Sequence, residues 1–405
     1  MKFLTILFLT LPLYAQVILG IDKLTSDQTL RKYLQNKTIA ALAHPASLNS
    51  KGEHLVDILY KDRSFKLKVL FTPEHGLRKL QDDWIEDGVD SITGIPYYSL
   101  YKSDRRSPNA QLLKNIDVII IDLQDVGMRF YTFNTTMALT LKAAFENNVD
   151  VLILDRPNPL GGLAVEGFNL DKSLLGHFIS FFEIPTRHSL TIAEMALYYL
   201  QTQNFSNSTS KLHLVKMQNW NRNMIWEETQ IPWNTPSPAL VTPMNAYMYS
   251  ILGSLESFNL SVGRGIDNHD AFLVYGAPWI TLEESHLLSQ NLNLISPHIQ
   301  FTPYYWFVTR GPYKGEKAHG VKVSHLDFKM VNGFKILIEV ISKFEILFQE
   351  RFKATEKNSW TDRYLGNKNI WDWIQEGKDF NEILTLSYQS QKKLKNFKKD
   401  FALYP

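Results

Sequence analysis

Acidic and basic side chains follow several apolar segments of this sequence, and their types suit acid–base catalysis. The segment Leu67–Phe71 runs into Thr-Pro and then presents Glu74 and His75. Hydrolysis of a glycosidic bond needs two carboxyl groups, one to protonate the leaving oxygen and one to act as base or nucleophile. Apolar walls would favour the protonated form of Glu74, and His75 beside it could orient or protonate that carboxyl group. Glu74 is therefore the candidate acid.

Three further apolar segments of the N-terminal half also end in polar side chains. The segments are Thr38–Ala43, Asp117–Ile121 and Val149–Leu154. The polar residues that follow them are His44, then Asp122, Gln124 and Asp125, then Asp155, Arg156 and Asn158. A single residue of this kind often caps a helix or forms a turn. Their recurrence at four successive strand ends favours a polar active-site floor instead.

Helical patterns separate these predicted strands. They cover residues 26–35, 52–61 and 135–147, and a Thr-x-x-Glu capping box begins a further helix at Thr191–Leu200. Strands that are apolar throughout and alternate with helices predict a parallel sheet buried on both faces. Doubly wound sheets of this kind bind ligands at the carboxyl ends of their strands. We therefore expect an α/β fold with a Rossmann-like, doubly wound, mostly parallel sheet.

The length of 405 residues favours two domains over a single core. The segment 231–243 contains four prolines and is expected to be extended and irregular. We therefore expect an N-terminal catalytic domain at residues 16–243 and a smaller α+β domain at residues 244–405 that completes the cleft. Neither GxGxxG nor GxxxxGK follows a predicted strand, so the sequence indicates no nucleotide cofactor.

The first residues and the composition bear on location and partners. Met1 and Lys2 precede an apolar run of about a dozen residues, which is typical of a secretory signal peptide, with cleavage expected after Ala15. The absence of cysteine excludes disulfides, thiol catalysis and cysteine-held metals. The 43 Lys and Arg residues against 41 Asp and Glu residues give no electrostatic reason to expect nucleic acid as a partner. Since no later segment could span a bilayer, the sequence predicts an exported protein, periplasmic or secreted, without stable membrane insertion after signal cleavage.

Two chemical interpretations of the strand ends stay open from residue types alone. In the first, Asp122 or Asp125 supplies the second carboxylate of a glycosidase. Arg129 and Arg156 then bind an anionic group of the substrate. In the second, the same aspartates together with Asp155 and His75 hold a divalent cation for metal-assisted hydrolysis. The sequence lacks HExxH or another tight ligand spacing, which favours the first interpretation over the metal.

Longer strings of the sequence resemble one protein family. They are LFTPEHGLR, TGIPYYSLY, DVIIIDLQDVGMRFYTF, LDRPNPLGG, IPTRHSLTIAE, IPWNTPSP, NLSVGRGID, GAPWI and YKGEKAHGV, in this order. Together they are similar to the bacterial exo-β-N-acetylmuramidase family, from residue 38 to 321 and more loosely to the C-terminus. The resemblance implies a Rossmann-like domain, a smaller C-terminal domain and a cleft between them. It also implies an exo-acting glycoside hydrolase that releases N-acetylmuramic acid from the non-reducing end of peptide-free peptidoglycan fragments, in cell-wall turnover or recycling.

The resemblance also implies roles for residues at matching positions. The PEHG glutamate is Glu74, the implied catalytic acid, and we expect His75, Asp122 and Asp125 to complete the catalytic group. The expected substrate-binding residues are His44, Gln124, Arg129, Tyr131, Asp155, Arg156, Asn158, Arg187, His188, Arg264 and Asp267. N-acetylmuramic acid carries a lactyl carboxylate, so an arginine such as Arg129, Arg187 or Arg264 should face it.

Two features depart from the family pattern. After PEHGLR the sequence has Lys79 where glycine is usual and a loop that looks shorter, with Asp83 near the position of a common glutamate. If this loop shapes the entrance of the cleft or supplies the second carboxylate, the range of substrates could differ from that of the family. Late in the chain, Ala318 stands where cysteine is common, which argues against an essential thiol there.

A third functional alternative is a non-catalytic protein that binds wall glycan. It would apply if Glu74 and the aspartates were solvent-exposed helix or turn caps.

Overall fold

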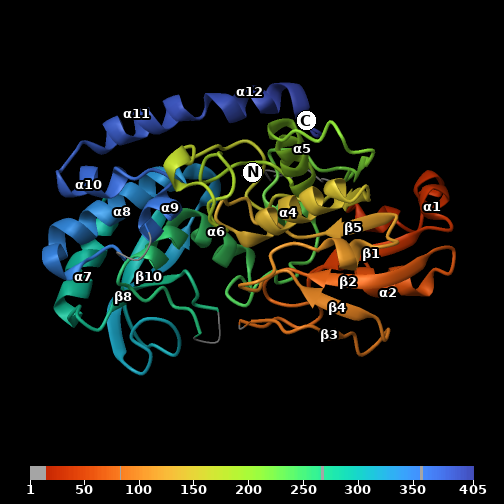
Figure 1. Ribbon diagram of the computed structural model, residues 1–405. Helices are drawn as coiled ribbons and strands as arrows, with labels where there is room; N and C mark the ends of the chain where they lie inside the picture. Colours follow the sequence, from red (N-terminus) through yellow and green to blue (C-terminus); the bar gives the residue numbers. More distant parts are fainter. Residues whose placement is uncertain (1–14, 83, 266–268, 356–358) are drawn as a thin grey trace, which may run out of the picture.

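The computed structural model describes residues 15–82, 84–265, 269–355 and 359–405, which form two sheets surrounded by helices (Figure 1). The larger sheet contains β1 (Thr38–Ala43), β2 (Lys66–Thr72), β3 (Gly88–Val89), β4 (Pro96–Ser99), β5 (Val118–Asp122), β6 (Asp150–Leu154) and β7 (Leu212–Val215). The smaller sheet contains β8 (Val274–Ala277), β9 (Ile299–Phe307) and β10 (Lys317–Leu326). The predicted signal peptide lies at residues outside the described part of the chain, apart from Ala15.

Helices divide between the same two regions. Those near the larger sheet are α1 (Gln28–Leu34), α2 (Leu55–Lys61), α3 (Ala110–Leu113), α4 (Thr132–Glu146) and α5 (Ile192–Thr202). The others are α6 (Pro243–Leu252), α7 (Leu282–Leu292), α8 (Gly333–Phe348), α9 (Trp360–Leu365), α10 (Ile370–Gln375), α11 (Phe380–Ser390) and α12 (Lys392–Phe401). Short 3₁₀ turns occur at Ile21–Lys23, Lys172–Leu174, Trp226–Thr229, Gly253–Ser257, Phe328–Met330 and Gln349–Arg351. Within the described residues, no helix combines the length and apolar character that a bilayer span requires.

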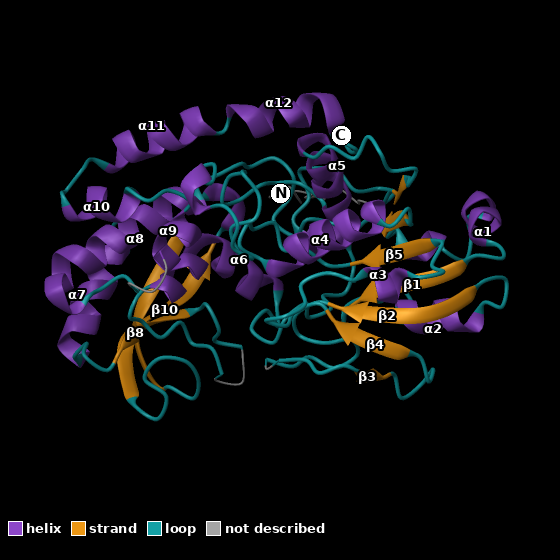
Figure 2. Cartoon of the chain, viewed as in Figure 1, coloured by secondary structure: helices purple, strands orange, loops and turns teal. Residues whose placement is uncertain are grey.

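The larger sheet is doubly wound. Its strand order is β3-β4-β2-β1-β5-β6-β7, and every neighbouring pair except β3 with β4 is parallel. The chain therefore moves outward from β1 through β2 to β4, then returns to the other side of β1 at β5. Right-handed crossovers place α2 on one face and α4 and α5 on the other, as Figure 2 shows. Because both faces are covered, the central strands are apolar throughout and buried, as the sequence predicted.

Most predicted elements coincide with observed ones. The strand Thr38–Ala43 has the predicted bounds, and Thr191 caps α5 through the predicted capping box with Glu194. Helix α4 begins at Thr132, three residues before the predicted start. The antiparallel sheet β8-β10-β9 with its helices gives the smaller α+β region (Figure 2), so the predicted fold class is confirmed.

The C-terminal helices cross from one region to the other. Helix α11 packs against α8, and α12 packs against α5 (Figure 1). Phe397 of α12 meets Tyr198 of α5 edge to face, with ring centroids 5.1 Å apart. Beyond α12, the hydroxyl of Tyr404 donates a hydrogen bond of 2.5 Å to Asp155 Oδ2 and accepts one of 3.0 Å from the Met217 N–H. The end of the chain is thereby fixed to the carboxyl end of β6.

Replacing Tyr404 with Phe should lower the free energy of unfolding by about 1–3 kcal/mol, because it removes a buried hydrogen bond to a carboxyl group. Urea unfolding followed by circular dichroism measures the change. Tyr60→Phe, at an exposed tyrosine, is the matched control and should leave the midpoint of the urea transition unchanged. Equal transitions for the two variants would show that the contact with Asp155 does not stabilise the protein.

Candidate active site

A cavity of about 220 Å³ lies where the carboxyl ends of β2, β4 and β5 meet the C-terminal region. From the larger sheet, Glu74 and His75 follow β2, Tyr101 follows β4, and Tyr131 precedes α4. The full lining is Glu74, His75, Asp82, Tyr101, Phe130, Tyr131, Thr132, Ile179, Ser237, Ala239, Leu240, Tyr249, Glu256, Arg264, Phe272, Trp360 and Tyr364. Carboxylates and aromatic rings thus share one small space, which is a usual composition for a sugar site.

The turn after β2 holds Glu74 in place. The Thr132 hydroxyl, at the first residue of α4, donates a hydrogen bond of 2.7 Å to Glu74 Oε2. His75 adopts a backbone φ of +74°, which is unusual for a residue with a side chain. The Nδ1 of its ring lies 2.9 Å from the carbonyl oxygen of Gln81, so the histidine also fixes the loop that follows. The unusual backbone conformation of His75 thus belongs to the turn that presents Glu74 to the cavity.

Asp82 joins the two regions at the cavity wall. Its carboxylate accepts from Arg264 Nη2 at 3.1 Å and from Arg310 Nη1 at 2.8 Å. Arg264 Nη1 also donates to Glu256 Oε1 at 2.8 Å, and the two carboxylates, first that of Glu256, raise the pKa of Arg264. His75 Nδ1 lies 3.9 Å from Asp82 Oδ1. Ion pairs therefore join a loop that follows the larger sheet to the C-terminal region.

Three tyrosines add neutral hydroxyl groups to the lining. Burial raises the pKa of Tyr131, Tyr249 and Tyr364 well above the ordinary value of a phenol. For Tyr131, the charges of Asp125 and Glu74 raise the pKa further. These hydroxyl groups therefore stay protonated and can donate hydrogen bonds to a ligand.

Four of the predicted site residues line the cavity, namely Glu74, His75, Tyr131 and Arg264. The predicted residues that lie away from its lining are His44, Asp122, Gln124, Asp125, Arg129, Asp155, Arg156, Asn158, Arg187 and His188. All ten are buried and form hydrogen bonds or ion pairs within the protein. Asp267, like Asp83, lies outside the described residues.

The switch point of the sheet, between β1 and β5, is filled by one of these internal contacts. Arg156 donates to both oxygens of Asp122, at 2.5 Å and 2.7 Å, and to the Leu48 carbonyl oxygen at 2.9 Å. Beside this pair, the Gln124 N–H donates to the Nε2 atom of His44 at 3.0 Å. Burial lowers the pKa of His44 well below its usual range, so this ring is neutral. The position where a doubly wound sheet usually binds its ligand is thus closed by the protein's own side chains.

The other buried cations and acids fix neighbouring loops. Arg129 donates to the carbonyl oxygens of Arg363 and Tyr364 at the end of α9, at 2.8 Å and 3.1 Å. Arg187 forms an ion pair of 2.8 Å with Glu166. The other such contacts are His188 Nε2 to Asp125 Oδ2 at 3.3 Å and Asn158 Nδ2 to the Leu190 carbonyl oxygen at 3.0 Å. Gln124 Nε2 donates to the carbonyl oxygens of Asp125 and Pro157, both at 2.8 Å.

The four side chains considered for a divalent cation do not converge. Asp122 is paired with Arg156, and Asp125 with His188. Asp155 accepts hydrogen bonds from Thr191, Ala193 and Tyr404. His75 lies instead on the cavity beside Gln81. No group of three histidine, aspartate or glutamate side chains with the spacing of a metal site occurs in the part of the chain that the structure describes.

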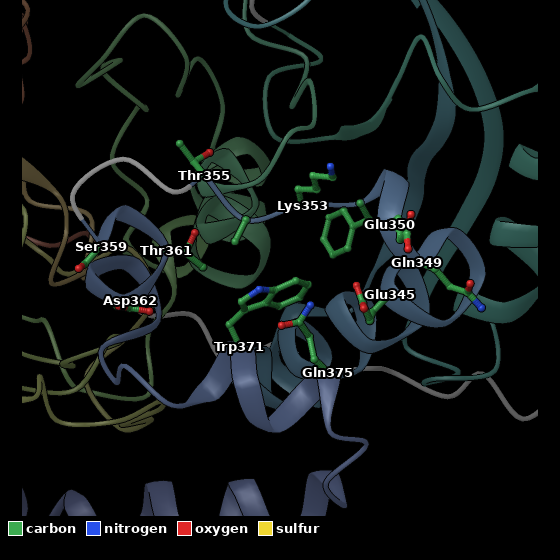
Figure 3. A pocket seen from close by; sticks show the side chains of 12 residues that line it. Glu345, Gln349, Glu350, Lys353, Thr355, Ser359, Thr361, Asp362, Trp371 and Gln375 are labelled. Carbon is green, nitrogen blue, oxygen red and sulfur yellow. The ribbon is translucent and has the colours of Figure 1, made fainter.

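A larger hollow of about 630 Å³ lies among α8, α9 and α10. Figure 3 shows Trp371 in its middle, with Glu345 and Gln375 beside the indole ring. Burial raises the pKa of Glu345. The lining of this hollow includes no residue from a strand end of the larger sheet and no predicted site residue. The smaller cavity, where Glu74 lies, is therefore the candidate active site.

Sequence reasoning missed several residues of the cavity lining. The principal ones are Asp82 after β2, Tyr101 after β4, Thr132 at the start of α4, and Glu256 and Tyr364 of the C-terminal region. Two signals existed, because Thr132 follows the predicted Tyr131 directly, and Asp82 lies in the loop that departs from the family pattern. Glu256 and Tyr364 carry no local signal, since only the packing of distant segments places them here.

Comparison with known proteins gives concordant results. Residues 39–244 match the family model described as "Exo-beta-N-acetylmuramidase NamZ, N-terminal", and residues 247–404 match its C-terminal counterpart. The peptidoglycan beta-N-acetylmuramidase NamZ of Bacillus subtilis (strain 168) is 34% identical over 387 residues, which is 95% of this chain and 91% of that protein.

Two crystal structures of DUF1343 family proteins from Bacteroides fragilis NCTC 9343 are similar in fold. One has a TM-score of 0.85 at 31% identity, and the other has a TM-score of 0.74 at 26% identity. Each comparison covers 96% of this chain and 99% of the other.

Asp155 should make stability depend on pH. Burial raises the pKa of its carboxyl group to about 7. Between pH about 4 and about 7, the folded protein keeps a proton that the unfolded chain has lost, so the free energy of unfolding falls as pH rises through this window. The loss amounts to at most roughly 4 kcal/mol.

Asp155→Asn removes the titrating group and should flatten this part of the profile. Thermal melts of wild type and variant, at pH 4.5 to 8, measure the difference. The variant should gain stability relative to wild type as pH rises. A constant difference between the two proteins across this range would contradict a protonated Asp155.

Proposed function

The chain belongs to the NamZ exo-β-N-acetylmuramidase family, and we propose that it is an exo-acting glycosidase that releases N-acetylmuramic acid from the non-reducing end of peptide-free peptidoglycan fragments. The family resemblance predicted from the sequence motifs is confirmed. The observation that carries the proposal for this chain is the position of Glu74, hydrogen-bonded to Thr132 inside a cavity that two further carboxylates line.

Glu74 serves as the general acid in this proposal. Its carboxyl group is fixed by Thr132 and by the turn through His75. It is therefore already oriented to donate a proton to the leaving oxygen. The second carboxylate is Asp82 or Glu256, each of which lines the cavity and is ion-paired to Arg264. Their position favours them over Asp122 and Asp125, which lie behind the lining.

Arg264 is the arginine that we propose to face the lactyl carboxylate. Of the three arginines considered, it lines the cavity, whereas Arg129 and Arg187 bond to backbone carbonyl oxygens and to Glu166. A bidentate guanidinium suits a carboxylate. The lactyl carboxylate of the substrate would then compete with Asp82 or Glu256 for the N–H groups of Arg264.

We also propose that the protein is exported and acts in the periplasm or outside the cell. The charged start and the apolar run before Ala15 support this location. It agrees with a substrate derived from the cell wall. After removal of the leader, the protein would act without insertion into a membrane and without nucleic acid as a partner.

Turnover of a chromogenic β-N-acetylmuramide, compared with the matching β-N-acetylglucosaminide, tests the activity. We expect cleavage of the muramide alone, because only this sugar carries the lactyl carboxylate, and we expect the same rate with EDTA. Rates that collapse with EDTA and return with a divalent cation would instead support the metal-dependent hydrolase. Failure to cleave either glycoside, with binding of the glycan retained, would support a wall-glycan binding protein.

Glu74→Gln should lower kcat by at least about a hundredfold and leave the affinity for substrate nearly unchanged, since glutamine keeps the shape but cannot donate the proton. Glu345→Gln, in the larger hollow, is the matched control and should retain the wild-type rate. Comparable rates for the Glu74 variant and wild type would remove this residue from the mechanism.

A further inference from the structure

The loop after β2 carries an exposed tryptophan beside the cavity. Trp84 has 57% of its surface exposed, which is unusual for so large an apolar side chain. Its ring stacks on Tyr101, with centroids 5.5 Å apart and an interplanar angle of 27°. Tyr101 in turn lines the cavity together with Glu74. An aromatic surface therefore continues from the cavity wall to the outside of the protein.

A cation and a third ring hold this surface together. The guanidinium carbon of Arg106 lies 4.5 Å from the ring centroid of Tyr101, 4.6 Å from that of Phe178 and 5.8 Å from that of Trp84. Phe178 meets Tyr101 edge to face at 5.3 Å. Cation–π attraction of this kind fixes ring positions. The exposed side of Trp84 is thus presented in one orientation.

The loop itself is anchored on its other side. Asp82, two residues before Trp84, is bound by Arg264 and Arg310 of the C-terminal region. The Arg310 Nη2 atom also donates to the Asp82 carbonyl oxygen at 2.6 Å. Because the loop is fixed at this point, a ligand that contacts Trp84 would lose less free energy to the ordering of the loop.

We propose that Trp84 and Tyr101 form the subsite for the leaving sugar, the neutral N-acetylglucosaminyl residue on the reducing side of the cleaved bond. This inference rests on the proposed function. The general acid must stand on the side of the leaving oxygen, so the leaving sugar lies next to Glu74. From Glu74, the wall continues through Tyr101 to Trp84. The C–H groups of a pyranose face carry slight positive charge, which suits the negative face of an indole.

The test measures binding of two sugars in the Glu74→Gln background, where turnover is slow. The ligands are the disaccharide N-acetylmuramyl-N-acetylglucosamine and free N-acetylmuramic acid, each titrated by calorimetry. Trp84→Ala should weaken binding of the disaccharide by about tenfold or more and change that of the monosaccharide less than about twofold. Trp84→Phe should retain most of the affinity, because a ring face remains.

Tyr305→Ala is the matched control. Tyr305 is also 57% exposed and has a cation, Lys317, 4.4 Å above its ring, but it does not line the cavity. Its loss should change neither affinity. Equal effects of Trp84→Ala on both sugars, or no effect on either, would overturn the subsite alone. A wild-type protein that neither binds nor cleaves these sugars would overturn the proposed function and this inference with it.

Discussion

The ion pair of Asp122 with Arg156 closes the crevice where a doubly wound sheet usually binds its ligand. Both side chains are almost fully buried at the carboxyl ends of β5 and β6. Two charges removed from water are stable only when they neutralise each other and their remaining hydrogen-bonding groups are satisfied. Arg156 meets this requirement by binding both oxygens of Asp122 and the Leu48 carbonyl oxygen. The pair therefore occupies this crevice, and the cavity that contains Glu74 lies at the adjacent edge, beyond β2 and β4.

At that adjacent edge the sheet supplies only part of a cavity. Glu74 and Tyr101 come from the sheet, whereas Glu256 and Arg264 come from the C-terminal region. The contact of Asp82 with Arg264 and Arg310 joins the two parts at the cavity wall. A site built in this way is complete only when both parts are in place, so a change at the contact would alter the shape of the cavity as well as its charge.

The sequence predicted the sheet well because buried parallel strands leave a strong pattern. Thr38–Ala43 and Asp150–Leu154 are apolar on both faces, which few other local structures require. The candidate site was predicted less completely, for a physical reason. A polar residue at a strand end looks the same in sequence whether it faces a cavity, as Glu74 does, or an internal partner, as Asp122 does. The two cases differ only in whether the fold brings a partner such as Arg156 next to the polar residue. Residues such as Glu256 reach the cavity solely through tertiary packing.

The attachment of the last helices also constrains the order in which the protein can mature. Asp155 lies at the end of β6, yet one of its hydrogen-bond donors, Tyr404, is 249 residues further along the chain. A ribosome or an export channel delivers the polypeptide from its N-terminus. Asp155 therefore lacks its phenolic donor until nearly all of the chain has emerged, although Thr191 and Ala193 are present much earlier. The hydrogen bond that ties the end of the chain to β6 is accordingly one of the last contacts of the fold that can form.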